Sequence, residues 1–183
     1  MYIETEATPN PATLKFLPGR PVLAEGVLDM ADAGAAEVSP LARRLFGLEG
    51  VVRVFLATDF LSVTLGHDDW DGAKPQVLGA IMDHFLSGEP VVTADVRGLA
   101  GHDAYEGEDA EIVGEIKELL DTRVRPAVAQ DGGDIVFHAF RDGIVYLHMR
   151  GSCSGCPSST LTLKRGIENM LKHYVPEVAA VEA

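Results

Sequence analysis

The 183-residue chain has few cysteines, few basic side chains and no long apolar run. Two cysteines are too few for a disulfide-rich secreted scaffold. Lys and Arg number 15 against 28 Asp and Glu, a net charge of −13, which argues against nucleic acid or an anionic membrane as the main partner. No stretch approaches the roughly 18 apolar residues of a transmembrane helix. The hydrophobic fraction of 46% is nevertheless that of a globular protein.

The first six residues contain two acids and lack the apolar segment of a signal peptide. We therefore expect a soluble protein in a reducing compartment. In such a compartment, two nearby cysteines are more often metal-binding or redox-active than joined in a structural disulfide.

Acidic side chains are unevenly spread along the chain. Residues 1–100 carry 14 acids and 7 bases, whereas residues 112–183 carry 9 and 8. Residues 101–111 carry five acids and no base, which is typical of a solvated, extended linker. We therefore predict a domain over 1–98, an acidic linker over 99–111 and a second domain over 112–183, each domain large enough to hold its own core.

The N-terminal domain shows short strand and helix patterns. Ser39 and Pro40 are typical of an N-cap followed by proline at the first helical position. Gly88 is a helix-stop signal. The predicted elements are a strand over 13–17, a helix over 41–46, a hairpin of strands 51–56 and 60–65, and a helix over 73–86. Because no cluster of metal ligands lies here, we interpret this domain as a binding or structural module.

The C-terminal domain begins with a helix and a glycine turn. Helical spacing of apolar residues begins at Ile112, and Pro126 is expected to end or kink that helix at Arg125. Asp131-Gly132-Gly133-Asp134 requires a turn. The other predicted elements are a hairpin of strands 135–140 and 144–149, a helix over 163–174 and a strand over 178–181. The fold class is α/β (α+β), with a hairpin packed against helices in each domain.

Cys153 and Cys156 lie on the loop before the last predicted helix and are the main functional indication. Pro157 fits the first turn of that helix, whose N-terminus presents partial positive charge to the loop. This setting favours thiolates, the form that binds metal or attacks disulfides. Flanking glycines leave backbone room for a bulky cluster, and residues 151–162 contain no acid.

Two sulfurs cannot complete an ordinary metal site, because structural zinc takes four ligands and cubane clusters are commonly held by four thiolates. A histidine could complete the site, two chains could each give a cysteine pair, or the pair could be a redox dithiol. Thioredoxin-like motifs open a βαβ unit, whereas this pair follows a hairpin late in the chain. Of the six histidines, only His148 ends the preceding strand, and we expect such residues to pack or face solvent. The six are His67, His84, His102, His138, His148 and His173.

The sequence resembles two families of iron–sulfur proteins in the right order over nearly its whole length. The C-terminal half is similar to the NifU-like domain through Arg125-Pro126, Asp131-Gly132-Gly133-Asp134, Gly151-Ser152-Cys153, Cys156-Pro157-Ser158-Ser159, Thr162-Leu163-Lys164 and Gly166-Ile167-Glu168. The N-terminal half resembles the Nfu N-terminal domain through Thr8-Pro9-Asn10-Pro11, Leu14-Lys15-Phe16-Leu17-Pro18-Gly19, Ser39-Pro40-Leu41-Ala42, Leu45-Phe46 and Asp59-Phe60. The chain is thereby identified as a member of the Nfu-type scaffold or carrier family.

The resemblance implies a binding and transfer protein, not an enzyme. Family members hold a [4Fe–4S] cluster between two subunits, each giving both motif cysteines, here Cys153 and Cys156. The implied partners are a second copy of the chain, an upstream assembly scaffold and apo-proteins that receive the cluster, with no nucleic acid and no membrane. The N-terminal domain is expected to recognise partners. Two cysteines per chain also leave a [2Fe–2S] cluster open.

Two other classes stay in view. One is a thiol–disulfide oxidoreductase that uses the cysteine pair, and the other is a zinc-bridged interaction module. Mitochondrial relatives carry a transit peptide, and none is evident here. We therefore expect a bacterial cytoplasmic protein, or a mitochondrial matrix protein if the chain is a processed eukaryotic form.

Overall fold

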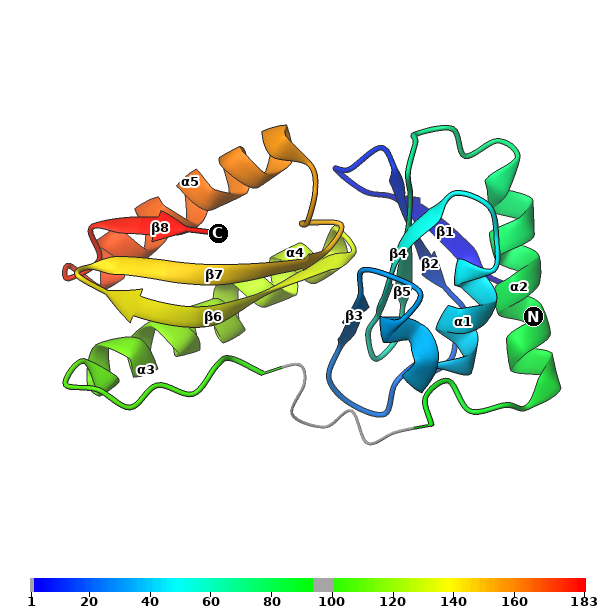
Figure 1. The fold of residues 1–183 in the computed structure, drawn as a ribbon. Helices are drawn as coiled ribbons and strands as arrows, with labels where there is room; N and C mark the ends of the chain where they lie inside the picture. The colour runs from blue at the N-terminus through cyan, green and yellow to red at the C-terminus, as the bar shows by residue number, and fades with distance from the viewer. Residues whose placement is uncertain (1, 94–100) are drawn as a thin grey trace. The chain divides into compact units, whose positions relative to one another are not determined.

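The computed structural model describes residues 2–93 and 101–183, apart from the side chains of 157–159. The chain forms two compact units, residues 1–100 and 101–183, each with its own sheet and helices (Figure 1). Strands and helices are mixed in both units, which confirms the α+β class. Among the described residues, no helix is long and apolar enough to cross a bilayer.

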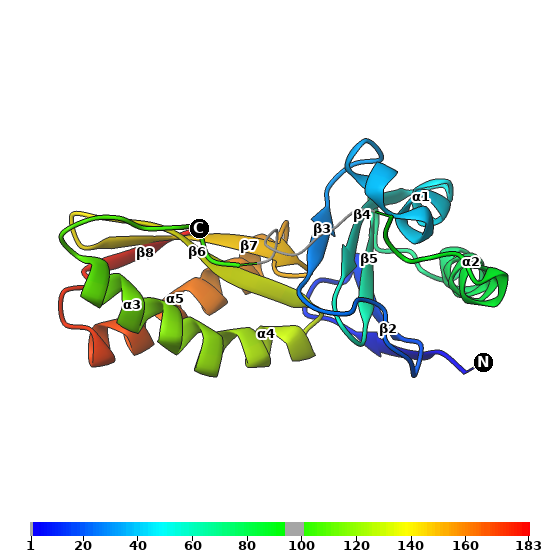
Figure 2. The same ribbon diagram turned by 90° about the horizontal axis from the view of Figure 1, so that it is seen from below.

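The N-terminal unit is a five-stranded antiparallel sheet with two helices on one face (Figure 2). The strand order is β1-β2-β5-β4-β3. Buried side chains such as Phe16, Leu45 and Ile81 fill the core between sheet and helices. The elements are β1 (Glu4–Ala7), β2 (Thr13–Leu17), β3 (Leu28–Met30), a 3₁₀ turn (Ala35–Val38), α1 (Pro40–Phe46), β4 (Val51–Leu56), β5 (Leu61–Leu65) and α2 (Ala73–Ser87).

The main elements predicted for this unit are confirmed. The Ser39 hydroxyl accepts the N–H of Ala42 at 3.1 Å and caps α1, which begins at Pro40. β4 and β5 pair as the predicted hairpin, and α2 ends before Gly88, which has φ +74°. The sequence did not indicate β1 or β3. β1 has mainly exposed side chains and lacks the alternation that identifies a half-buried strand. β3 is three residues long, too short for its alternation to be recognised.

The C-terminal unit has three α-helices packed on one face of a three-stranded sheet (Figure 2). β6 and β7 form an antiparallel hairpin, and β8 pairs in parallel with β7. Asp142 and Gly143 at the hairpin turn have φ values of +50° and +76°, as a type I′ turn requires. The elements are α3 (Ala110–Leu119), α4 (Arg125–Gln130), β6 (Gly133–Arg141), β7 (Ile144–Gly151), α5 (Pro157–Tyr174) and β8 (Ala180–Glu182).

The first α-helix of this unit ends earlier than Arg125, where Pro126 was expected to end or kink it, and a second α-helix begins there. α3 stops at Leu119, a π-helical turn spans Leu120–Val124, and α4 begins at Arg125 with Pro126 in its first turn. A proline ring in a regular helix clashes with the carbonyl four residues earlier. The wider π turn moves that carbonyl away, so the proline stands at the start of a new helical segment.

The expected acidic linker, 99–111, differs from the structure in its described part, which begins at residue 101. The Asp103 N–H donates to the Phe137 carbonyl at 2.9 Å, and the Phe137 N–H donates to Nδ1 of His102 at 2.8 Å. The Lys117 ammonium donates to the Asp103 carbonyl at 2.7 Å. Because these backbone groups are satisfied by β6 and α3, residues 102 and 103 belong to the C-terminal unit.

His84 on α2 is a fully buried histidine. Neither ring nitrogen has a hydrogen-bond partner among the described residues, and Nδ1 lies 4.0 Å from the Glu89 carboxylate. Burial and the nearby charge of Arg44 lower the pKa of His84, against a smaller raising effect of Glu89. The folded N-terminal unit therefore holds this imidazole neutral.

We predict that the N-terminal unit loses stability as the pH falls below 6.5, the ordinary His pKa. The unfolded chain takes up the proton there, whereas the folded unit resists it down to its lowered pKa. His84→Leu removes this titration. From about pH 7 to about pH 5, the free energy of unfolding of His84→Leu, measured in urea, should decrease less than that of the wild type. The exposed His67, changed to Leu, is the control. Equal pH slopes for His84→Leu and the wild type would contradict the prediction.

Candidate functional site

The two cysteines lie on the short loop between β7 and α5, as predicted. β7 ends at Gly151, Cys156 is the N-cap residue of α5, and Pro157 is the first residue of that helix. Gly151 and Gly155 have φ values of +62° and +89°, a conformation that glycine adopts without steric cost. The loop therefore turns tightly enough to lead from β7 into α5 within a few residues.

Cys153 is buried in the core of the C-terminal unit, with 7% of its surface exposed, whereas Cys156 is half-buried. Burial raises the pKa of Cys153 to about 12, helped by the carboxylates of Asp131 and Asp134 and opposed by a hydrogen bond from Ser152. The expectation of a stabilised thiolate is therefore wrong for Cys153. Desolvation of the sulfur raises its pKa more than the partial positive charge of the helix N-terminus lowers it. The fold also places the carboxylates of Asp131 and Asp134, which lie outside the loop, near this sulfur.

The Asp131-Gly132-Gly133-Asp134 segment packs directly against the cysteine loop. The Ser152 N–H donates to the Gly132 carbonyl at 3.2 Å, and the Ser152 hydroxyl donates to the Asp131 carbonyl. Gly133 pairs with Gly151 at the start of β6. A Cβ at Gly133 would lie 2.5 Å from the Cys153 sulfur and 2.8 Å from the Arg150 carbonyl oxygen. Glycine at this position is therefore what lets the two segments meet.

An ion pair fixes the glycine segment from the other side. Nε and Nη2 of Arg125 donate to the two carboxylate oxygens of Asp134 at 2.8 and 3.0 Å, and Nη1 donates to Asp121 at 2.9 Å. Asp134 is only 4% exposed. The bidentate pair with Arg125 compensates for removing this carboxylate from water. Arg125 thus ties the start of α4 to the start of β6, next to the cysteine loop.

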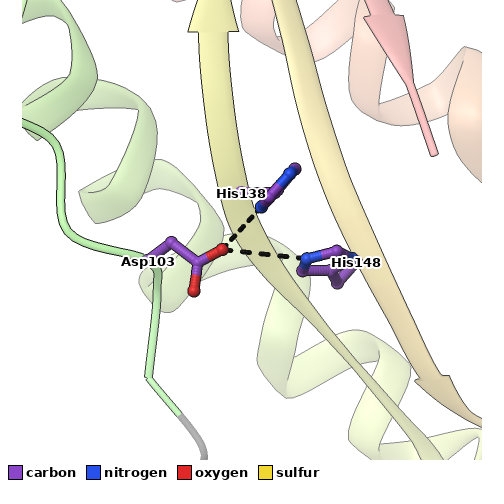
Figure 3. A group of neighbouring side chains, drawn as sticks. All are labelled: Asp103, His138 and His148. Carbon is purple, nitrogen blue, oxygen red and sulfur yellow. Dashed lines mark hydrogen bonds and ion pairs between the residues drawn. The ribbon is translucent and has the colours of Figure 1, made fainter.

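A second group of potential metal ligands was missed by the sequence analysis. Asp103, His138 and His148 each bring one potential ligand atom to within 4.8 Å of the others (Figure 3). Among the described residues, they form a group that could hold a metal ion. Asp103 was assigned to a solvated linker, and the histidines were expected to pack or face solvent. The available signal was that His138 and His148 lie on the paired strands of a predicted hairpin.

Two family models match the chain in the order of its units. The model described as "Scaffold protein Nfu/NifU N terminal" matches residues 3–88, and the "NifU-like domain" matches residues 116–182. The human protein named "NFU1 iron-sulfur cluster scaffold homolog, mitochondrial" is 52% identical over 185 residues, which cover 100% of this chain and 71% of the human protein. "NifU-like protein 4, mitochondrial" of Arabidopsis thaliana is 50% identical over 100% of this chain and 65% of the plant protein.

These matches define a two-domain scaffold of the kind that the sequence resemblance suggested. The chain belongs to the Nfu family of iron–sulfur cluster scaffold proteins. The resemblance stated on the sequence is thereby confirmed. The ligand role of Cys153 and Cys156 stays a prediction, which the geometry of their loop supports.

We predict that Gly133→Ala destabilises the C-terminal unit, because the added methyl group would overlap the Cys153 sulfur and the Arg150 carbonyl. Overpacking of this kind costs about 1–3 kcal/mol. The control is Gly166→Ala on α5, where an added Cβ meets no atom within 4 Å and should stabilise the helix by roughly 0.5–1 kcal/mol. Urea unfolding of both variants measures the difference. A Gly133→Ala protein as stable as the wild type would refute the close contact.

Proposed function

We propose that this chain is a carrier whose cargo, a [4Fe–4S] cluster, is bound by Cys153 and Cys156 from each of two subunits and passed to apo-proteins. The observation that carries the proposal is that the only two cysteines of the sequence share one short loop. Clusters of this type are commonly held by four thiolates. Two chains that meet at this loop supply four.

The burial of Cys153 supports a cargo that is held for a limited time. A thiol that is 7% exposed must move outward to meet a cluster shared at a subunit boundary. It must also give up a proton, because thiolate is the form that binds metal. Loop movement and deprotonation both weaken cluster binding relative to a site that is already open and ionised. A carrier benefits from that weakening, because it has to release its cluster.

Transfer then proceeds by exchange of one thiolate for another. A thiolate of the receiving protein forms a bond to a cluster iron while the bond from that iron to the Cys153 sulfur breaks. Neither iron nor sulfur changes oxidation state in this exchange. The released Cys153 sulfur takes up a proton from the solvent and returns to its buried position as a neutral thiol, so it no longer competes for the cluster.

The oxidoreductase alternative is disfavoured by the same burial. A nucleophilic cysteine works best when its pKa is near the ambient pH and its sulfur is accessible, and Cys153 has neither property. The human relative is named as a scaffold homolog, which agrees with a role without catalysis. The zinc-bridged module is distinguished by metal content, since it would hold about one zinc per dimer.

The family assignment supports a proposal for the partners and the location. We propose that the N-terminal unit recognises the donor or the receiving protein, because no candidate ligand cluster lies among its described residues. The relatives reported above are named as mitochondrial proteins. These names support the mitochondrial alternative, and the expectation of a bacterial cytoplasm gains no support from them.

Replacing either cysteine by alanine should abolish cluster binding and leave the fold intact. The wild type, reconstituted without oxygen, should hold about four iron and four sulfide per dimer and show the broad absorption of a [4Fe–4S] cluster. Cys153→Ala and Cys156→Ala should each hold less than a tenth of that iron. About two iron and two sulfide per dimer in the wild type would indicate the [2Fe–2S] form instead.

The matched control is Ser154→Ala, because Ser154 lies between the two cysteines and its N–H donates to the Gly151 carbonyl through the backbone. This variant should load as the wild type does. Circular dichroism checks that each variant is folded. An undiminished cluster spectrum in either cysteine variant would overturn the assignment, and colourless wild-type protein that reduces insulin disulfides would favour the oxidoreductase.

The second expectation concerns the number of chains. The cluster-loaded protein should elute as a dimer of two 19.6 kDa chains, and the cluster-free protein mainly as a monomer, because the cluster supplies the link between subunits. Anaerobic size-exclusion chromatography with light scattering measures both masses, and iron analysis of the same fractions gives the loading. A monomer that holds a complete cluster would disprove the shared site.

A further inference from the structure

Three side chains with metal-binding chemistry meet on the C-terminal unit outside the cysteine loop. His138 lies on β6, His148 on the neighbouring strand β7, and Asp103 on the segment that precedes α3 (Figure 3). The Asp103 carboxylate is 2.6 Å from Nδ1 of His138 and 3.7 Å from Nε2 of His148. The two imidazole rings are 4.2 Å apart between centroids.

The backbone explains why these residues meet. The pairing of β6 with β7 shifts between Phe137 and Ala139, so His138 is the extra residue of a β-bulge. The bulge leaves His138 unpaired. His148 pairs with Val136, and His138 is two residues after Val136, so strand alternation places both histidines on the same face of the hairpin.

Asp103 is held in place by backbone contacts and not by its carboxylate alone. Its N–H donates to the Phe137 carbonyl, one residue before the bulge, and its carbonyl accepts from Lys117 on α3. The neighbouring His102 accepts the Phe137 N–H. The third ligand is thus positioned by three hydrogen bonds before any ion arrives, as an effective binding site requires.

The charges of the group suit a cation at neutral pH. The hydrogen bond from His138 lowers the pKa of Asp103, so its side chain is a carboxylate. Burial, followed by the neighbouring His138, lowers the pKa of His148, which favours the neutral imidazole that binds metals. Arg150 lies close enough to act on both groups and reduces the affinity for a cation, while the half-exposed side chains leave room for water ligands.

We propose that Asp103, His138 and His148 form a binding site for a divalent first-row transition-metal ion, of which Zn²⁺ is the representative. Two imidazoles and one carboxylate are ligands that such ions accept, and three protein ligands leave a position open for water or another donor. Ligand atoms around one tetrahedral ion at about 2.1 Å lie roughly 3.4 Å apart. The Asp103–His138 pair therefore has to open by less than 1 Å.

The ion would join the segment around residue 103 to both strands of the hairpin. In its absence, the Asp103 and His138 side chains add one hydrogen bond between half-exposed groups to the bonds that already hold this segment. Such exposed pairs contribute little stability. Metal binding would replace that bond by coordination and fix the chain where it enters the C-terminal unit. The site lies outside the cysteine loop and does not depend on cluster binding.

The test is Zn²⁺ binding to the full chain without a histidine tag, in the Cys153→Ser/Cys156→Ser background that removes the competing thiols. Competition with a chromophoric chelator gives the affinity and the stoichiometry. One Zn²⁺ per chain should bind. His138→Ala, His148→Gln and Asp103→Asn should each weaken binding at least tenfold, whereas His173→Ala, an exposed histidine on α5, should leave it unchanged.

A second measurement identifies the ligands directly. In the same background, Co²⁺ should give weak visible bands of a nitrogen and oxygen site, without the intense near-ultraviolet bands of thiolate ligation. NMR should show the rings of His138 and His148 shifting together as Zn²⁺ is added. Equal Zn²⁺ affinity in all four variants, or unshifted His138 and His148 rings at saturating Zn²⁺, would overturn the proposal and leave the three residues as a hydrogen-bonded group only.

Discussion

The close approach of β6 to the cysteine loop at Gly133 is the contact on which the C-terminal unit depends. There is no room for a side chain at this position, because a Cβ would overlap the Cys153 sulfur and the Arg150 carbonyl. Backbone and hydroxyl groups of Ser152 bond to the same glycine segment, and Arg125 holds its far end through the buried Asp134. Motifs that are 20 to 30 residues apart in the sequence therefore form one packed cluster around a single sulfur.

β7 links the two sites discussed above. It carries His148 in its middle and leads through Gly151 into the cysteine loop, and it is the central strand between β6 and β8. β8 pairs only with the start of β7, at Ile144, Val145 and Tyr146, whereas β6 pairs along the whole strand. The part of β7 that carries His148 and leads to the cysteine loop is therefore positioned by its pairing with β6. The loop that follows it has glycines with positive φ at both ends.

The sequence was informative where local chemistry determines structure. The Ser39-Pro40 cap, both hairpins and the place of the cysteine pair between strand and helix were predicted, because each depends on neighbouring residues. Features that depend on residues distant in the sequence were not predicted. The raised pKa of Cys153 comes mainly from burial in a packed core, with smaller contributions from Asp131 and Asp134. The Asp103 group requires a docked segment that local acidity had suggested was solvated. The π turn before Pro126 likewise depends on the packing of Leu120 and Val124 in the core.

The burial of Cys153 has a chemical consequence for a chain that holds no cluster. Oxidation by peroxide proceeds through an accessible thiolate, and Cys153 is both neutral and covered by the core. Disulfide formation with Cys156 is slowed for the same reason, because a disulfide forms when one thiolate attacks. The fold thus protects the Cys153 sulfur against oxidation for as long as it stays in its buried position.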